Sequence, residues 1–391
     1  MLLLLLLLRA VLAHENGTRV RGHGFTFVAS AVEQRTVSVD HTWKVEGEHG
    51  DKQTRRLRKP RGLTLARCDR AVVRLYNDNI WGCGRRSPAS RAHAKGHFLE
   101  CDHKQPASAT VTRARGYLGL DLFSPVFQHA MVNGVTAAAG VWAEFLADPE
   151  GKLLCHETTC AFAEAALGSG DRLLRGRKCD EIYFPNGLVA AVVRGDVPFA
   201  GAFDALLPPY TAALLDASTP ARDLLVYASR NHDAFKGKRQ RPADVTIFES
   251  FRPGNFNKNR HRRAWLGKRT VANESAVVAA LRSVAERAGL TFELFRYESP
   301  ERSARVFAAA RVVVGPHGGA LANLVHCEAG TIVVEIMPKA RARLYYAGLA
   351  YAKKLRFVAF AASRFAYDGP DIVLDPAALA RAVDLALTRP S

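Results

Sequence analysis

The stretch from residue 312 to 338, VVVGPHGGALANLVHCEAGTIVVEIMP, constrains the fold more than any other part of the chain. One apolar, β-branched run ends at Gly315, and a second run follows the pair Gly330-Thr331. Short apolar runs of this kind, bounded by glycine, are typical of strands buried in a parallel sheet. The stretch therefore predicts a strand, a glycine turn, a short helix and a second strand, with His317 where the first strand ends.

Strands and helices alternate along most of the chain. In the second half, we expect strands over 222–230, 244–250 and 291–297, and helices over 273–289 and 299–310. In the first half, we expect strands over 71–83, 95–101, 151–156 and 180–185, and helices over 123–148 and 158–170. This alternation predicts an α/β protein in which helices cover the faces of parallel sheets.

The length of 391 residues suits two domains of about 150 to 200 residues each. A segment rich in proline and small residues, at 208–221, marks the passage between them. We therefore expect an N-terminal domain over 66–215 and a C-terminal domain over 216–391. Residues 14–65 are polar and dotted with glycine, and we expect them to be irregular.

The glycine turn has the composition of a ligand-binding site. In a doubly wound sheet, ligands bind at the carboxyl ends of the strands, where the N-terminus of a helix offers free amides to a phosphate. Gly315, Gly318 and Gly319 permit close approach of the backbone, and Glu335 is expected at the end of the next strand, facing sugar or ribose hydroxyls. The alternative is that the glycines only form a tight turn, which His317 caps.

The run GPHGGALANL, followed by GTIVVEIMP, resembles the signature of glycosyltransferase family 61, which is roughly GxHGAGLxN and then GTxVxEIxP. Three further segments agree in order: FQHAMVNGV with His129, LLVYASR ending at Arg230, and RTVANESAVVAALRS beginning at Arg269. The resemblance is strongest over about 222–340. One departure is Gly319-Ala320, where the family has alanine and then glycine.

This resemblance implies a GT-B fold, in which two Rossmann-like domains enclose a cleft and the C-terminal domain holds the nucleotide-sugar. The N-terminal domain would then face the acceptor. It also implies inverting transfer of N-acetylglucosamine, xylose or arabinose from a UDP-sugar to a protein or polysaccharide. The compartment implied is the endoplasmic reticulum or the Golgi.

The residues that would carry this chemistry can be assigned by their type. The sequence has no DxD motif, so we expect no metal, and cationic side chains would neutralise the leaving diphosphate. The residues expected to bind the donor are Arg230, Arg269, Gly315, Pro316, His317, Gly318, Gly319, Ala320 and Glu335, with Arg262 or Arg263 in reserve. His129 and His317 are the candidate catalytic residues, with His129 as general base and His317 either on the diphosphate or beneath the sugar. A structural role remains the alternative for His129 and for Arg269, and Asn323 is expected to bond local backbone groups.

The net charge of +18 favours an anionic partner. Two basic runs, at 51–61 and 257–269, carry much of this charge, and the first is expected to be a solvated loop. The alternatives to a transferase are a catalytically inactive relative that binds a sugar nucleotide or glycan, and a basic nucleic-acid-binding protein. No recognisable nucleic-acid-binding module is present, so we expect no nucleic-acid partner, and no GxSxG elbow supports an esterase.

The N-terminus suggests entry into the secretory pathway. Residues 1–13 resemble the apolar core of a signal peptide or a weak anchor, which leaves lumenal membrane association open. Six of the seven cysteines lie in the first half, as a lumenal domain with disulfides would show, and the odd count leaves at least one thiol free or intermolecular. Sequons at Asn16 and Asn273 permit glycosylation in such a compartment.

Overall fold

The structure is a computed structural model. It describes residues 18–21, 26–29, 31–47, 52–75, 97–101, 104–119, 134–156, 160–176, 180–194, 204, 206–215, 220–230, 270–296, 298–338, 345–362 and 372–388. The described residues form two compact units: unit 1 lies within 18–37 and 60–194, and unit 2 lies within 38–59 and 204–388. Unit 2 contains the glycine turn.

Unit 2 is built on a parallel sheet, as the alternation of strands and helices predicts. Its strands, in spatial order, are β14 (Thr291–Phe295), β13 (Leu224–Ala228), β15 (Ala310–Pro316), β16 (Ile332–Pro338), β17 (Arg356–Ala362) and β3 (Ala31–Gly47). All of these neighbours pair in parallel. The strands from β13 to β17 therefore follow the order 2-1-3-4-5 of a doubly wound sheet, which has a switch point between its first and third strands.

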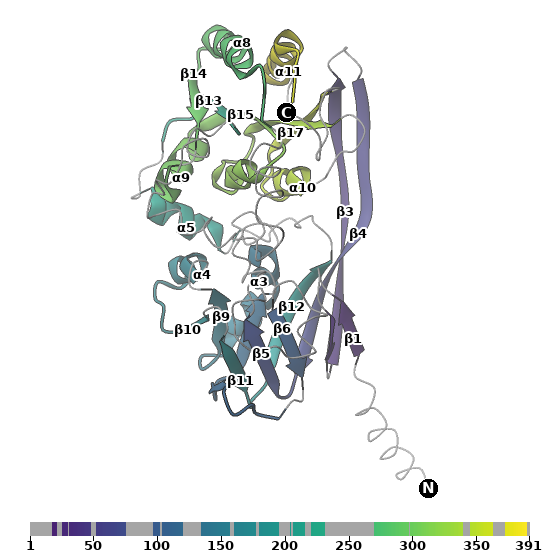
Figure 1. Cartoon of the computed structure of the whole chain (residues 1–391), viewed down its shortest axis with the longest axis vertical. Helices are drawn as coiled ribbons and strands as arrows, with labels where there is room; N and C mark the ends of the chain where they lie inside the picture. Colours follow the sequence, from purple (N-terminus) through teal and green to yellow (C-terminus); the bar gives the residue numbers. More distant parts are fainter. Residues whose placement is uncertain are drawn as a thin grey trace, which may run out of the picture. The chain divides into compact units, whose positions relative to one another are not determined.

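Helices cover both faces of this sheet (Figure 1). On one face, α8 (Glu274–Arg287) and α11 (Pro376–Thr388) pack together over the strands and share a core with alternate strand residues such as Val312, Val314 and Val334. On the other face lie α5 (Leu207–Leu214), α9 (Pro300–Ala308), α10 (Tyr345–Ala352) and the 3₁₀ helix η5 (Gly319–His326). Because both faces are covered, β16 is buried along its whole length.

Unit 1 is mixed rather than parallel. One sheet has the order β10 (Leu173–Gly176), β9 (Lys152–His156), β8 (Gly116–Gly119), β12 (Leu188–Arg194) and β4 (Lys52–Cys68), and β4 is antiparallel to β12. A second sheet contains β6 (His97–Cys101), β5 (Ala71–Leu75), β11 (Glu181–Phe184) and β7 (Thr110–Val111). The described helices are α3 (Val135–Ala147) and α4 (Cys160–Leu167), and β1 (Thr18–Arg21) pairs with β2 (Thr26–Ala29).

The expectation that residues 14–65 are irregular is wrong for the described part, which consists of β1, β2, β3 and most of β4. The basic run at 51–61 likewise lies in a strand and not in a loop. The sequence holds a signal for this, since valine and threonine recur through 31–47 and favour strands. Strand β4 is also held at its far end, where residues 62–68 pair with β12 in the core of unit 1.

Two disulfides join cysteines among the described residues of unit 1. Cys68 at the end of β4 is joined to Cys101 at the end of β6, and Cys155 in β9 is joined to Cys160 in α4. Cys327 in unit 2 is free and buried, which confirms that at least one thiol stays unpaired.

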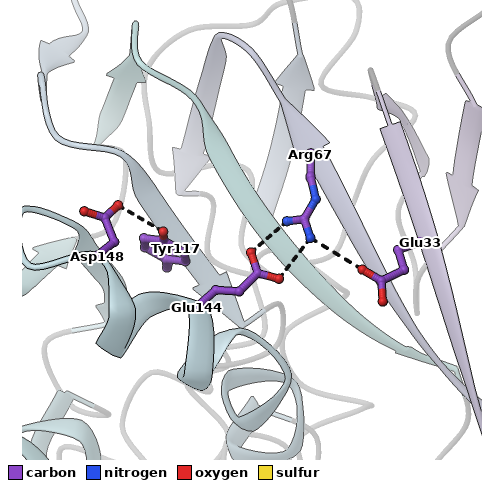
Figure 2. A network of polar contacts seen from close by, with 5 residues as sticks. All are labelled: Glu33, Arg67, Tyr117, Glu144 and Asp148. Atoms are coloured by element: carbon purple, nitrogen blue, oxygen red, sulfur yellow. Dashed lines mark hydrogen bonds and ion pairs between the residues drawn. The ribbon is translucent and has the colours of Figure 1, made fainter.

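A polar network fastens α3 to the sheet of unit 1 (Figure 2). The guanidinium of Arg67 on β4 holds both carboxylate oxygens of Glu144 on α3, at 2.8 and 2.9 Å, and contacts Glu33 on β3 at 3.4 Å. The hydrogen bond with Glu144 raises the pKa of Arg67. Near the end of the same helix, the hydroxyl of Tyr117 donates to Asp148 at 3.0 Å. These contacts have a structural role because they join elements of one unit.

Candidate functional site

The glycine turn lies at the switch point of the unit 2 sheet. β13 has β14 on one side and β15 on the other, and the carboxyl ends of β13 and β15 are adjacent because the strands are parallel. Arg230 follows β13 by two residues, and Pro316 is the last residue of β15. The fold therefore brings together two segments that are about 90 residues apart in sequence, at the edge where doubly wound sheets bind ligands.

Arg230 lies directly against the turn. Its Nη1 donates to the backbone carbonyl of His317 at 3.4 Å, and a Cβ on Gly318 would lie only 1.6 Å from this nitrogen. The φ of Gly318 is 170°, an extended backbone that any residue can adopt, so glycine is required here for space. Because Gly318 has no side chain, Arg230 can lie directly against the turn.

Gly315 serves the packing of the two strands. A Cβ at this position would lie 3.1 Å from the Cβ and 3.2 Å from the carbonyl oxygen of Ala228 on β13. These distances are tighter than most real Cβ contacts, and the neighbour includes backbone, which cannot move away cheaply. A glycine at the end of β15 therefore allows the carboxyl ends of β13 and β15 to approach each other.

The helix after the turn begins at Gly319 and is a 3₁₀ helix. The first amides of a helix have no acceptor within it, and the helix dipole makes this end attractive to an anion. Asn323 is buried, and its side-chain amide donates to the carbonyl of Ala320 at 3.0 Å. This contact confirms that Asn323 bonds local backbone groups. The amide end of η5 and the guanidinium of Arg230 thus lie at one turn, and both favour a negative charge.

His317 is held inside the protein beside Glu335. Its backbone amide donates to the carbonyl of Ile336 at 2.9 Å, and its Nδ1 forms a hydrogen bond with Oε1 of Glu335. The ring of Tyr346 from α10 meets the imidazole edge to face, with a centroid distance of 5.2 Å. Only 4% of the His317 side chain is exposed. The imidazole therefore has a single, well-supported orientation.

Glu335 lies in the middle of β16 and not at its end, and its side chain is fully buried. Burial raises the pKa of this carboxyl, and the nearby His317 partly offsets that shift. The sequence predicts the correct strand for Glu335. Helices, however, cover the face of β16 on which its side chain lies. In this structure Glu335 meets His317 rather than a surface that sugar or ribose hydroxyls can reach.

A second carboxylate contacts Ser229, the residue before Arg230, and sequence reasoning missed it. The hydroxyl of Ser229 donates to Oε1 of Glu274 at 2.6 Å, and Glu274 comes from the first turn of α8. Burial, together with Glu274, raises the pKa of the Tyr227 hydroxyl. A signal was available, because an acidic residue directly after an asparagine is typical of a helix start, where it complements the dipole.

Several of the predicted residues lie outside the part of the chain that the structure describes. His129, Arg262, Arg263 and Arg269 lie outside the described residues, as does the segment 1–13. Within the described ranges, no group of three or more His, Cys, Asp or Glu side chains is arranged to hold a metal ion. Among the helices of those same ranges, none combines the length and the hydrophobicity that a membrane span requires.

Comparison with protein families identifies a match that covers the site. The family described as Glycosyltransferase 61 matches residues 127–334, which is more than half of the chain. The matched region contains Arg230, the glycine turn and His317, and it ends directly before Glu335. None of the curated proteins matches the chain.

Proposed function

The chain belongs to glycosyltransferase family 61, and from this premise we propose that it is an inverting transferase that moves N-acetylglucosamine or a pentose from a UDP-sugar. The acceptor is a hydroxyl of a protein or a glycan. Membership of the family implies glycosyl transfer in general, and the nucleotide, the sugar and the stereochemistry are the proposed part. The two units correspond in this proposal to the two domains of a GT-B enzyme, with the donor on unit 2.

One observation carries the proposal: the guanidinium of Arg230 lies against Gly318, at the amide end of η5. A diphosphate has only acceptor oxygens and carries negative charge, so it needs donors and cations. An arginine pairs two such oxygens at once, and helix amides supply further donors in fixed positions. This combination at a switch point of a doubly wound sheet suits a nucleoside diphosphate.

Different residues are proposed to stabilise the leaving group and to deprotonate the acceptor. The acceptor oxygen attacks the anomeric carbon as the bond from that carbon to the diphosphate breaks, so that UDP leaves with the bonding electrons. Arg230, the η5 amides and, in this proposal, Arg269 stabilise the negative charge that develops on UDP. A general base takes the proton of the acceptor hydroxyl, and His129 is proposed for this role.

Metal independence is part of the same proposal. The sequence has no DxD pair to hold a cation against the diphosphate, and two arginines can supply the charge that a metal would otherwise provide. A chelator should therefore leave transfer activity largely intact, whereas a strict requirement for manganese would overturn this part.

The compartment proposed is the lumen of the endoplasmic reticulum or Golgi. Two disulfides support it, because disulfides persist in the oxidising secretory pathway and are rare in the cytosol.

The decisive experiment is a binding screen of the purified chain against UDP and a panel of UDP-sugars, followed by transfer and hydrolysis assays. Arg230→Ala should weaken UDP binding roughly ten- to a hundredfold, since hydrogen bonds to charged groups contribute about 1.5–3 kcal/mol. Arg287→Ala is the matched control, because it removes an arginine of the same unit that pairs with Asp384 on the surface. Failure of the intact chain to bind any UDP compound would refute the proposal, and binding without turnover would favour the catalytically inactive relative.

A further inference from the structure

The start of α8 lies at the same edge of the sheet as the glycine turn, but on the opposite face. Ser229 directly follows the last residue of β13, and its hydroxyl donates at 2.6 Å to Oε1 of Glu274, in the first turn of α8. Helix η5 begins on the other face, where Arg230 meets Gly318. In a doubly wound sheet, ligands bind at such a switch point. A ligand that spans the carboxyl ends of β13 and β15 would therefore meet Arg230 on one side and Glu274 on the other.

Tertiary contacts fix the place where α8 begins. Val271 bridges to Ile372, and two backbone hydrogen bonds, of 2.7 and 2.9 Å, tie the residues on either side of it to Ile372. The side chain of Asn273 bonds the backbone of Leu374 and does not cap the helix. Glu274, the next residue, therefore projects from a well-anchored element, as a group that positions a ligand must.

The polar groups around Glu274 retain hydrogen-bonding capacity. A carboxylate can accept about four hydrogen bonds, and the donor that Glu274 meets among the described residues is the hydroxyl of Ser229. The hydroxyl of Tyr227 on β13 is fully buried and has no hydrogen-bond partner in the same part of the chain, while burial and the nearby Glu274 raise its pKa. Glu274 itself is only half-buried. Because buried polar groups are normally bonded, this cluster points to a polar partner that the described residues do not supply.

The chemistry of Glu274 suits neutral hydroxyls and not phosphate. A carboxylate repels the oxygens of a diphosphate, but it accepts hydrogen bonds from the hydroxyls of a sugar. In other doubly wound sheets an acidic residue has this role toward the ribose of a bound nucleotide. If Arg230 and the amide end of η5 hold the diphosphate, the part of the nucleotide that carries hydroxyls is left for the side of the switch point where α8 begins.

We propose that Glu274 binds the ribose hydroxyls of the donor nucleotide and makes the site selective for a ribonucleotide over a 2′-deoxyribonucleotide. Ser229 orients the carboxylate through Oε1, which leaves Oε2 for the ribose. This inference rests on the proposed function, because Arg230 and η5 must hold the diphosphate for the ribose to reach Glu274. The role that the sequence predicts for Glu335 thus falls to Glu274.

The test compares UDP with 2′-deoxy-UDP in calorimetric titrations. The intact chain should bind UDP about tenfold or more tightly, as expected for a hydrogen bond to a charged group. Glu274→Gln keeps the shape and can still accept from Ser229, and the preference should fall to about threefold or less, mainly through weaker binding of UDP. Glu274→Ala accepts no hydrogen bond, so it should bind both nucleotides equally. Glu286→Gln is the matched control, because Glu286 is an exposed carboxylate near the other end of the same helix, and neither affinity should change.

The outcomes distinguish this inference from the proposed function. Equal binding of UDP and 2′-deoxy-UDP by the intact chain, or an unchanged preference in Glu274→Ala, would overturn the role of Glu274, while a loss of UDP binding in Arg230→Ala would still support the proposed function. A defect of Glu274→Gln that is limited to UDP-sugars, with normal UDP affinity, would also overturn it, because the carboxylate would then contact the transferred sugar. If Glu274→Ala does not fold, the preferences of the intact chain and of Glu274→Gln decide. If the intact chain binds no UDP compound, the proposed function fails and this inference fails with it.

Discussion

Replacing Gly318 with alanine should displace Arg230 and leave the fold intact. The added Cβ would lie 1.6 Å from Nη1, 2.8 Å from Cζ and 3.3 Å from Cδ of Arg230. Alanine adopts the extended backbone of position 318 without strain. Because the clash is with the far end of a flexible side chain, the guanidinium should move and the sheet should not.

The magnitudes differ for stability and for binding. Within the protein, the substitution breaks one 3.4 Å hydrogen bond from a half-buried guanidinium, and this bond contributes less than about 1 kcal/mol. For a unit of this size, that change lowers the Tm by no more than about 2–4 °C. A bound phosphate would be deprived of a charge-assisted hydrogen bond of about 1.5–3 kcal/mol, so the Kd for UDP should rise roughly ten- to a hundredfold.

The assay combines calorimetric titration with UDP and thermal unfolding of the same samples. Gly289→Ala is the contrasting control, because Gly289 has a φ of +65° and open space around its Cβ position. That substitution should cost about 1–2 kcal/mol of stability through backbone strain and leave UDP binding unchanged. In an Arg230→Ala background, Gly318→Ala should have no further effect. Wild-type affinity in Gly318→Ala, or a further decrease in affinity in the double variant, would refute the reasoning.

Three further predictions concern parts of the fold outside the turn. Burial lowers the pKa of His326 to about 3, so the unfolded chain binds a proton near pH 6.5 that the folded chain does not. Stability should therefore fall by about 1.4 kcal/mol per pH unit below pH 6.5, and urea unfolding of His326→Gln should show a shallower acid limb. Asn273 donates to the carbonyl of Leu374 at 2.8 Å and accepts from its amide at 3.2 Å, so the folded protein should carry no glycan at that sequon; a glycopeptide found there by mass spectrometry would contradict this. Glu144→Gln should weaken the pair with Arg67 and lower the free energy of unfolding by about 1 kcal/mol or less, with no change in UDP affinity.

The elements around the turn could be predicted because their signals are local. The stretch at 312–338 forms β15, η5 and β16 as predicted, since β-branched runs favour strands and glycines interrupt them. The helix predicted over 273–289 is α8, whose apolar positions Val277, Leu281 and Val284 all face the core. The strands β3 and β4 were missed because polar residues obscured their weak β-propensity and because their partners are distant in sequence.

The sequence by itself determined that a strand, a glycine bend and a helix follow one another at the end of β15, and that the bend carries a histidine. Only the tertiary structure decided that Arg230 lies against Gly318 and that Glu335 meets His317 inside the protein. The first set depends on backbone preferences of neighbouring residues. The second depends on which strands are adjacent and on how far the helices extend over them, and those contacts arise only when distant segments pack together.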